Sequence, residues 1–388
     1  MRDGLARVGT ADLVVGIPSF RNAATIGHVA GAVASGLRSF EGTRAAIVHA
    51  DGGSRDGTLE AAAAALDGSV PLVAGEYVGL PGKGSALRAI FEATDALGAR
   101  AGAVVDSDLR SITPEWIRRL LGPIADGRAD YVTPLYARHK HDGTITNSIA
   151  YPLTRALYGV SIRQPIGGEF GFSRDLARSF ARGGALGDGV WQTDVARFGI
   201  DIYMTTTALL SRARVAQAFL GAKVHDPKDP GADLAPMFSQ VVGTLFRIAA
   251  RNADAWRGVR GSRAAPVIGD VAPVEPEEVR ASVEILERKY AAGRSEHEAT
   301  WREVLERVPE TIDARTWARL VYDFLAAFAR DPDQGERYLR ALVPLYFARV
   351  ARFIADARDL TTAESERLVE EQAVAFEELK DHLRDRLS

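Results

Sequence analysis

Residues 101–108 read Ala-Gly-Ala-Val-Val-Asp-Ser-Asp, an apolar run that ends in two aspartates one residue apart. The run predicts a short buried strand. In extended backbone, residues two apart point to the same side, so Asp106 and Asp108 are expected to present their carboxylates to one site. Ligands of α/β sheets bind just past the carboxyl ends of the strands, and Mg²⁺ and Mn²⁺ prefer oxygen ligands. The stretch therefore predicts a metal that bridges the protein to a diphosphate, with simple capping of the next turn as the alternative.

On both sides of this stretch, apolar runs alternate with helical patterns through the first two hundred residues. The predicted strands cover residues 13–17, 45–50, 70–73, 101–105 and 130–135. The predicted helices between them cover residues 25–37, 58–66, 85–96 and 111–121. This alternation predicts an α/β fold with a mostly parallel sheet flanked by helices.

The pattern becomes helical from residue 236 onward. Residues 265–276 contain three prolines and no helical period, which favours a linker or excursion. Amphipathic helices are predicted at 277–290, 296–308, 314–330, 333–358 and 361–386. We therefore expect two domains, residues 1–264 for catalysis and residues 265–388 as a helical C-terminal region.

The composition restricts the class of function. The formal net charge of −3 gives no global attraction to nucleic acid or to an anionic membrane. The chain has no cysteine, which excludes disulfides and thiolate chemistry. No signal peptide and no apolar run of transmembrane length are found, so a cytoplasmic protein without a transmembrane segment is expected. Apolar faces on the terminal helices make a homodimer the expected assembly.

Two glycine-containing loops follow predicted strands. Residues 51–58 read Asp-Gly-Gly-Ser-Arg-Asp-Gly-Thr, in which Asp51 can accept hydrogen bonds from a base or ribose. Residues 79–84 read Gly-Leu-Pro-Gly-Lys-Gly, in which Lys83 offers a positive charge to phosphate. Ordinary turn chemistry is the alternative for both. No Gly-x-Gly-x-x-Gly follows the first strand, which argues against a dinucleotide dehydrogenase.

Three segments of the sequence, which follow one another in the order expected, resemble the GT-A glycosyltransferases. Residues 17–22, Ile-Pro-Ser-Phe-Arg-Asn, resemble the first-strand nucleotide loop of that fold; residues 51–58 are similar to its second-strand signature, and residues 106–108 to its metal motif. The resemblance implies a GT-A, Rossmann-like sheet that binds a UDP- or GDP-hexose. The nucleotide-sugar contacts that it implies are Pro18, Phe20, Asn22, Asp51, Lys83, Asp106, Ser107, Gly167 and Gly168.

A narrower resemblance covers residues 13–245. Residues 164–169, 198–201 and 221–225 resemble segments of the retaining group that includes mannosylglycerate synthase and glucosyl-3-phosphoglycerate synthase. By this resemblance His225 joins Asp106 and Asp108 as the third metal ligand. It also implies that Glu169, next to Gly167 and Gly168, lies between donor sugar and acceptor, and that Asp201 lies near the reacting centre.

The acceptor region resembles this group only loosely. Arg138, Lys140 and His141 precede residues 142–147, Asp-Gly-Thr-Ile-Thr-Asn, a loop suited to an anionic acceptor. Arg138, Thr146 and Asn147 are the predicted acceptor contacts. Exposed basic loop residues are the alternative.

The combined prediction is a metal-dependent, retaining hexosyltransferase. It moves glucose or mannose from a nucleotide-sugar to a small hydroxyl acceptor, for which a glycerate-like molecule is one candidate. Mg²⁺ or Mn²⁺ is the cofactor, and Asp201, Glu169 and Lys83 are the catalytic residues. The first alternative is an inverting GT-A transferase that acts on a lipid-phosphate or polysaccharide acceptor, with Asp194 as its general base. The second alternative is a silent sugar-nucleotide sensor or scaffold.

Overall fold

The computed structural model describes residues 1–224, 234–271 and 274–388, and the chain divides into two compact units. The first unit comprises Met1–Ala137, Ile166–Pro227 and Ala265–Pro276, and the second comprises Arg138–Pro165, Lys228–Ala264 and Glu277–Ser388. These units differ in composition from the predicted domains 1–264 and 265–388. Residues 138–165 group with the C-terminal helices and residues 265–276 group with the sheet, so a domain boundary at residue 264 stays a prediction.

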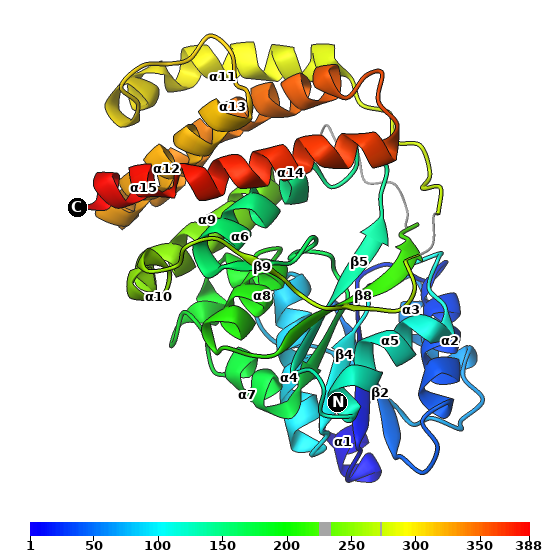
Figure 1. Ribbon diagram of the computed structural model, residues 1–388. Coiled ribbons are helices and arrows are strands. Elements are labelled where there is room, and N and C mark those ends of the chain that lie inside the picture. Colours follow the sequence, from blue (N-terminus) through cyan, green and yellow to red (C-terminus); the bar gives the residue numbers. More distant parts are fainter. Residues whose placement is uncertain (225–233, 272–273) are drawn as a thin grey trace. The chain divides into compact units, whose positions relative to one another are not determined.

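An eight-stranded sheet forms the centre of the first unit, in the order β10-β8-β5-β7-β4-β1-β2-β3 (Figure 1). Its strands are β1 (Leu13–Ser19), β2 (Ala45–Asp51), β3 (Leu72–Glu76), β4 (Ala101–Val104), β5 (Tyr131–Ala137), β7 (Phe170–Ser173), β8 (Val215–Ala222) and β10 (Val267–Ile268). Only the pairs that include β7 are antiparallel among the described pairs. The predicted mostly parallel sheet is confirmed, and every predicted strand is present.

Helices cover both faces of this sheet because the buried strands are apolar on both sides. The helices of the first unit are α1 (Arg2–Val8), α2 (Ile26–Arg38), α3 (Thr58–Ala64), α4 (Lys83–Ala96), α5 (Pro114–Ala125), α7 (Arg174–Ala181) and α8 (Ile200–Leu210). Val15 and Ile17 of β1 belong to the core shared with α2 and α5. Gly16 points the other way, where a side chain would collide with Ile90 of α4.

Two helix starts matter for the site. Thr113 has extended backbone and Pro114 occupies the first helical position of α5, as the sequence predicted. Helix α4 begins at Lys83 instead of near Ser85, and Gly82 precedes it with positive φ. Lys83 therefore lies in the first turn of a helix.

The second unit is mainly helical. Its elements are η1 (Thr146–Ala150), α6 (Tyr151–Tyr158), α9 (Leu234–Arg251), α10 (Ala253–Arg257), α11 (Val283–Val304), α12 (Ala314–Arg330), α13 (Gly335–Asp356), α14 (Thr362–Glu378), α15 (Lys380–Leu387) and the short strands β6 (Val160–Ser161) and β9 (Arg263–Ala264). The helices predicted at 277–290 and 296–308 are one helix, α11. It continues through Gly293, which lies against Pro344 of α13 where a side chain would not fit.

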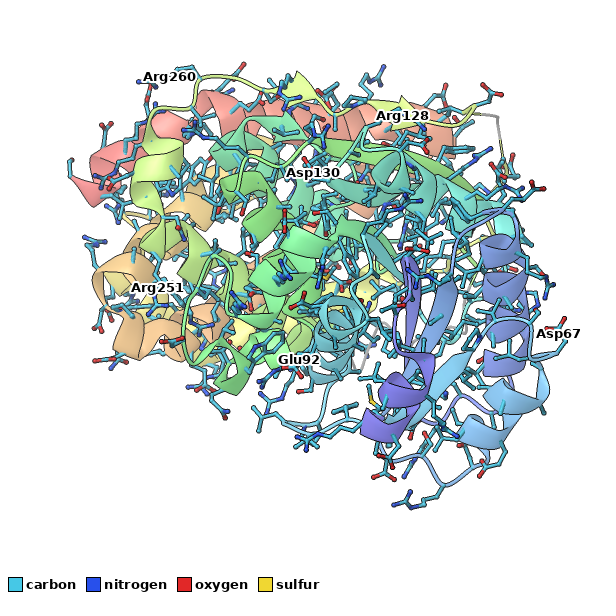
Figure 2. The ribbon with its side chains drawn as sticks, turned by 90° about the horizontal axis from the view of Figure 1, so that it is seen from below. Asp67, Glu92, Arg128, Asp130, Arg251 and Arg260 are labelled. Atoms are coloured by element: carbon cyan, nitrogen blue, oxygen red, sulfur yellow. The ribbon has the colours of Figure 1, made fainter. Side chains whose placement is uncertain are left out.

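Charged side chains cover the surface, among them Asp67, Glu92 and Arg128 (Figure 2). Each forms an ion pair with a neighbour while staying largely exposed, so these pairs contribute little to stability. Among the described helices, none is long and apolar enough to cross a membrane.

Candidate active site

The antiparallel strand β7 explains how distant acidic residues meet. Val104, the last residue of β4, pairs with Phe170, the first residue of β7. Because β7 runs against its neighbours, the residue that precedes it lies at the edge where the parallel strands end. Glu169 is thereby placed next to Asp106, although 62 residues separate them in the sequence.

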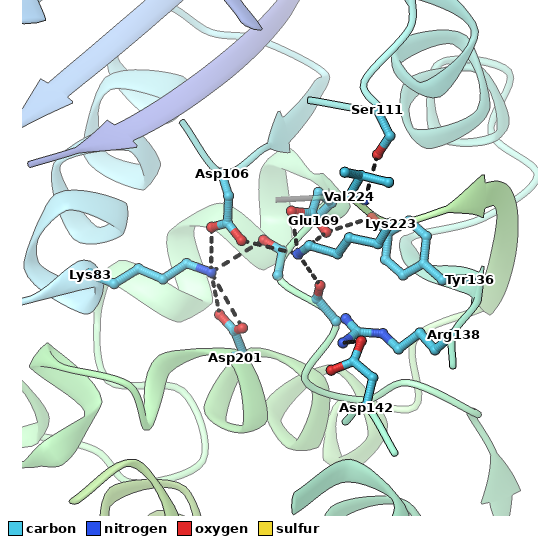
Figure 3. Close-up of polar contacts among 12 residues, drawn as sticks. Lys83, Asp106, Ser111, Tyr136, Arg138, Asp142, Glu169, Asp201, Lys223 and Val224 are labelled. Carbon is cyan, nitrogen blue, oxygen red and sulfur yellow. Dashed lines mark hydrogen bonds and ion pairs between the residues drawn. The ribbon is translucent and has the colours of Figure 1, made fainter. Parts of the chain in front are cut away.

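Lys83 connects two carboxylates at this edge (Figure 3). Its Nζ lies 2.8 Å from Oδ1 of Asp106 and 3.2 Å from Oδ1 of Asp201, which belongs to the first turn of α8. The same ammonium donates to the carbonyl oxygen of Gly168 at 3.4 Å. Residues that the sequence assigned separately to the phosphate, the metal and the reacting centre thus contact one another.

Lys223 forms the second half of the cluster. Its Nζ lies 3.2 Å from Oδ2 of Asp106, 2.9 Å from Oε1 of Glu169 and 3.0 Å from the carbonyl oxygen of Gly167. The Glu169 carboxylate is fully buried and also accepts a 2.5 Å hydrogen bond from the hydroxyl of Tyr136. Gly168 has a φ of 101°, and a side chain there would collide with both Asp106 and Lys223.

Sequence reasoning missed Lys223 and Tyr136. Lys223 directly follows the buried strand β8, and this position was the available signal. Nothing local in the sequence marks Tyr136, which reaches Glu169 only because β5 and β7 are neighbours.

Burial dominates the electrostatics of the cluster. It raises the pKa of Glu169 to about 7, with the charge of Asp106 in the same direction and that of Lys223 opposing. Burial likewise raises the pKa of Asp201, against the opposing charge of Lys83. For Lys83, burial alone would lower the pKa, but the charges of Asp106, Asp201 and Glu169 outweigh it and raise the pKa. Lys83 therefore stays a cation.

The carboxyl oxygens at this edge are of the donor type that a divalent cation prefers. Three carboxyl groups lie around the two ammonium groups, and the Asp108 carboxylate lies two residues beyond Asp106. Residues 107 and 108 lie in a turn after β4. The extended backbone from which Asp106 and Asp108 were expected to point to the same side therefore ends before Asp108. His225, the predicted third ligand, lies outside the described residues. Among the described residues, no group of three His, Asp or Glu side chains is arranged to hold a metal ion.

A second group of predicted residues joins the loops after β1, β2 and β4. Oδ1 of Asn22 accepts hydrogen bonds from the Ser107 hydroxyl at 2.8 Å and from the backbone N–H of Phe20 at 3.0 Å. The backbone N–H of Asn22 donates to the hydroxyl of Thr58 at 2.9 Å. Asn22 therefore ties three strand-end loops together, and its predicted contact with a nucleotide sugar stays a prediction.

Pro18, Phe20 and Asp51 occupy different environments near these loops. Pro18 is buried inside β1, whereas the side chain of Phe20 is 54% exposed. Asp51 ends β2 and is fully buried. Hydrogen bonds from Ser19 and Ser54 outweigh burial and lower the pKa of Asp51, so its carboxylate is ionised.

The predicted acceptor contacts lie in the second unit. Arg138 forms an ion pair with Asp142 at 3.0 Å, and the side-chain amide of Asn147 donates to the carbonyl oxygen of Asp142 at 3.1 Å. Thr146 is buried at the start of η1. These residues form one folded loop, and their role in acceptor binding stays a prediction.

Asp194, the candidate base for an inverting reaction, lies in a short 3₁₀ turn of the first unit. Its carboxylate pairs with Arg197 at 3.4 Å and is 30% exposed. It forms none of the ion pairs of the Lys83 and Lys223 cluster.

Comparison with protein families gives a match over residues 14–179, to the family described as glycosyl transferase family 2. Residues 14–179 therefore resemble a glycosyl transferase family 2 domain. The predicted enzyme class, a glycosyltransferase with the GT-A fold, is thereby confirmed. This glycosyltransferase matches no curated protein.

Several solved structures are similar to the glycosyltransferase. Glucosyl-3-phosphoglycerate synthase from Mycobacterium tuberculosis, in complex with Mn²⁺, UDP and glucosyl-3-phosphoglycerate, is 25% identical, with a TM-score of 0.48 over 65% of this chain and 84% of that chain. A crystal structure described as a mycobacterial protein is 26% identical, with a TM-score of 0.48 over 65% of this chain and 78% of that one.

Proposed function

We propose that this glycosyltransferase is metal-dependent and moves a hexose, glucose or mannose, from a nucleoside diphosphate donor to a small hydroxyl acceptor with retention of anomeric configuration. The observation that carries the proposal is the convergence of Lys83, Asp106, Glu169, Asp201 and Lys223 at the carboxyl edge of a glycosyltransferase sheet. Such a charged cluster, mostly buried, suits a reaction in which negative charge develops on a departing diphosphate.

The donor side of the site is proposed first. The loops joined by Asn22 would hold the nucleoside, and Lys83, with Lys223, would face the diphosphate as fixed positive charges. Asp106 and Asp108, with His225, would hold Mg²⁺ or Mn²⁺. When bound, such a cation neutralises charge on the diphosphate.

The reaction breaks the bond between the anomeric carbon of the hexose and the β-phosphate oxygen. A bond from that carbon to the acceptor oxygen forms on the same face, and the acceptor proton passes to the departing phosphate oxygen. Asp201, held by Lys83, would orient the acceptor hydroxyl or stabilise positive charge at the anomeric carbon. Glu169, held by Lys223 and Tyr136, would hydrogen-bond sugar hydroxyls between donor and acceptor. Positioning supplies much of the rate in such a site.

The acceptor is proposed to be small and anionic, with a glycerate-like molecule as one candidate and Arg138, Thr146 and Asn147 as its contacts. The experiment uses the full chain with UDP-glucose, GDP-glucose and GDP-mannose, Mn²⁺ or Mg²⁺, and glycerate or 3-phosphoglycerate. Release of nucleoside diphosphate and the anomeric configuration of the product by NMR are measured.

An α-linked product from an α-linked donor supports the proposal. A β-linked product would instead support the inverting alternative with Asp194 as base, and no release with any donor would support the silent sensor. Asp108→Ala should abolish metal-dependent release while the thermal unfolding temperature stays within a few degrees of wild type; near-normal turnover by this variant would contradict the assignment of the metal site.

A further inference from the structure

A buried chain of hydrogen bonds runs beneath the proposed nucleoside loops. Nε2 of His49, in the middle of β2, lies 2.7 Å from the hydroxyl of Ser19 at the end of β1. The same hydroxyl donates to Oδ1 of Asp51 at 2.7 Å. His49 and Asp51 are fully buried, and Ser19 is 7% exposed. None of the sequence motifs pointed to His49.

The direction of each hydrogen bond follows from the number of protons. A serine hydroxyl has one proton, and the ionised Asp51 can only accept, so Ser19 donates to Asp51. His49 must therefore donate from Nε2 to Ser19. Burial lowers the pKa of His49, which keeps the ring neutral with its proton on Nε2. Nδ1 is then a buried acceptor without a partner in the described part of the chain.

Asp51 has no acceptor position left for a ligand. Oδ1 accepts from the hydroxyls of Ser19 and Ser54, both at 2.7 Å. Oδ2 accepts from the backbone N–H groups of Gly53 at 2.9 Å and of Ser54 at 2.6 Å. A carboxylate offers about four such positions. Asp51 therefore shapes the loop from behind, and a direct contact with the base would first have to break one of these bonds.

The chain continues into the loop after β1. The Ser54 hydroxyl that donates to Asp51 also accepts from the backbone N–H of Arg21 at 2.8 Å. Arg21 has a φ of 59°, a left-handed conformation that is uncommon for residues other than glycine. Such a conformation persists where neighbouring bonds hold it, and the side chains of Phe20 and Arg21 are exposed.

Stability alone does not explain a histidine at this position. The neighbours of His49 along β2 are apolar and buried, and an unsatisfied buried nitrogen costs stability that a leucine would not. What His49 adds is the hydrogen bond that fixes the Ser19 hydroxyl toward Asp51.

We propose that His49 is a positioning residue for nucleoside diphosphate binding: through Ser19 and Asp51 it holds the loops 20–22 and 51–54 in the binding conformation without touching the ligand. This inference rests on the proposed function. If His49 had only a structural role, its replacement would lower the stability of the protein. A positioning role predicts instead that replacement weakens nucleoside diphosphate binding without lowering stability.

The test compares His49→Gln, His49→Asn and His49→Leu with wild type in calorimetric titrations with UDP and with GDP, each in the presence of MnCl₂. The amide nitrogen of glutamine reaches about as far as Nε2 of histidine, whereas that of asparagine is one methylene shorter. We expect His49→Gln to bind within about threefold of wild type, and His49→Leu and His49→Asn to bind about tenfold more weakly, as expected for one lost hydrogen bond. The thermal unfolding temperature of His49→Leu should not fall below that of wild type.

Equal affinity of wild type and His49→Leu would overturn the inference, and so would equal weakness of His49→Gln and His49→Leu. Ser19→Ala removes the hydroxyl that joins His49 to Asp51, and it tests the inference if His49→Leu does not fold. This variant should weaken nucleoside diphosphate binding as much as His49→Asn does. Wild-type affinity of Ser19→Ala would contradict the inference. If wild type binds neither UDP nor GDP, the proposed function fails first and this inference fails with it.

Discussion

At the scale of single residues, the charged side chains at the carboxyl edge of the sheet are balanced against one another. Both carboxylate oxygens of Asp106 are ion-paired, one with Lys83 and one with Lys223. Glu169 and Asp201 each share one of these lysines. Changing any one charge therefore alters the environment of all the others.

The first prediction concerns Asp106→Asn. The amide keeps the size of the side chain but removes the charge that faces both lysines, and we expect kcat/KM to fall by about 100-fold or more, in the range seen when a preorganised charge is removed. Release of nucleoside diphosphate measures the effect. Asp126→Asn, at an exposed position that pairs with Arg128, is the control and should retain full activity.

The second prediction is a dependence of stability on pH that comes from Glu169. Its pKa is raised by burial from 4.5 to about 7, so between these values the folded state holds a proton that the unfolded state has released. The contribution of this group to stability is fully present below about pH 4.5 and is lost as the pH rises through about 7. In urea unfolding experiments between pH 5 and 8, Glu169→Gln should reduce the change in the free energy of unfolding with pH by a few kcal/mol.

Tyr136→Phe serves as the matched variant for that experiment. The Tyr136 hydroxyl donates to Glu169 and favours the ionised carboxylate. Its removal should move the upper end of the pH window to higher values. An unchanged pH dependence in both variants would mean that Glu169 stays ionised in the folded protein.

At the scale of elements, close backbone approaches place the helix that carries Lys83. A side chain at Gly84, in the first turn of α4, would lie 1.8 Å from the carbonyl oxygen of Val195. The glycine thus lets the start of α4 lie directly on the segment that precedes α8.

The third prediction contrasts two glycines. Gly84→Ala should destabilise the protein by about 1–3 kcal/mol or more and lower activity, because backbone atoms cannot move aside as a side chain can. Gly31→Ala, in the interior of α2 with nothing within 4 Å of the new methyl group, should stabilise by about 0.5–1 kcal/mol. Chemical unfolding of both variants tests this, and a Gly84→Ala protein as stable as wild type would contradict the packing argument.

In the second unit, the C-terminal helices support the loop that contains the predicted acceptor contacts. Nζ of Lys140 donates to the carbonyl oxygens of Ala357, Arg358 and Leu360, at 2.8, 3.0 and 2.6 Å, just past the end of α13. The indole N–H of Trp317 donates to the carbonyl oxygen of Ser148 at 2.6 Å. These bonds give the C-terminal helices a structural role that their sequence did not reveal.

The fourth prediction is that Lys140→Met destabilises the protein by about 1–3 kcal/mol, because carbonyl groups at a helix end lose a charged donor. Arg340→Met, on α13 in an exposed ion pair with Glu336, should change stability by less than about 0.5 kcal/mol. If the two substitutions changed the free energy of unfolding in urea equally, the contacts of Lys140 would contribute nothing to stability.

At the scale of the whole molecule, the family match covers residues 14–179, which include part of each compact unit. The segment 138–165 of the second unit therefore belongs to the glycosyltransferase domain by sequence, although it packs with the C-terminal helices. Homodimer formation and a cytoplasmic location stay predictions.

The fifth prediction links binding to global stability. A ligand that binds only the folded chain stabilises it, by about 2.7 kcal/mol at a concentration 100 times its Kd. UDP or GDP with Mn²⁺ should therefore raise the thermal unfolding temperature, and EDTA should reverse most of the rise because the proposed metal joins protein and diphosphate. A shift that EDTA leaves intact would contradict the proposed metal dependence.

The parallel strands and the loops that follow β1, β2 and β4 were predictable from sequence pattern alone. The sequence also pointed to most of the charged cluster: Lys83 and Asp106 from pattern, Glu169 and Asp201 through resemblance. Apolar runs and the residues that follow them are local features, and parallel strands bring their carboxyl ends to one edge whatever the details of packing. These residues could therefore be predicted to lie near one another from the sequence.

Contacts between residues that are far apart in the sequence became visible only in the folded chain. The reversed direction of β7, the contact of Tyr136 and Lys223 with Glu169, and the strand pairing of residues 267–268 with β8 all depend on partners far away in the sequence. The same holds for Asp51, whose carboxylate is saturated by Ser19, Gly53 and Ser54. A hydrogen bond or an ion pair requires two groups at a defined distance. The sequence gives the chemical type of each group, but the distance between two groups depends on how the chain folds.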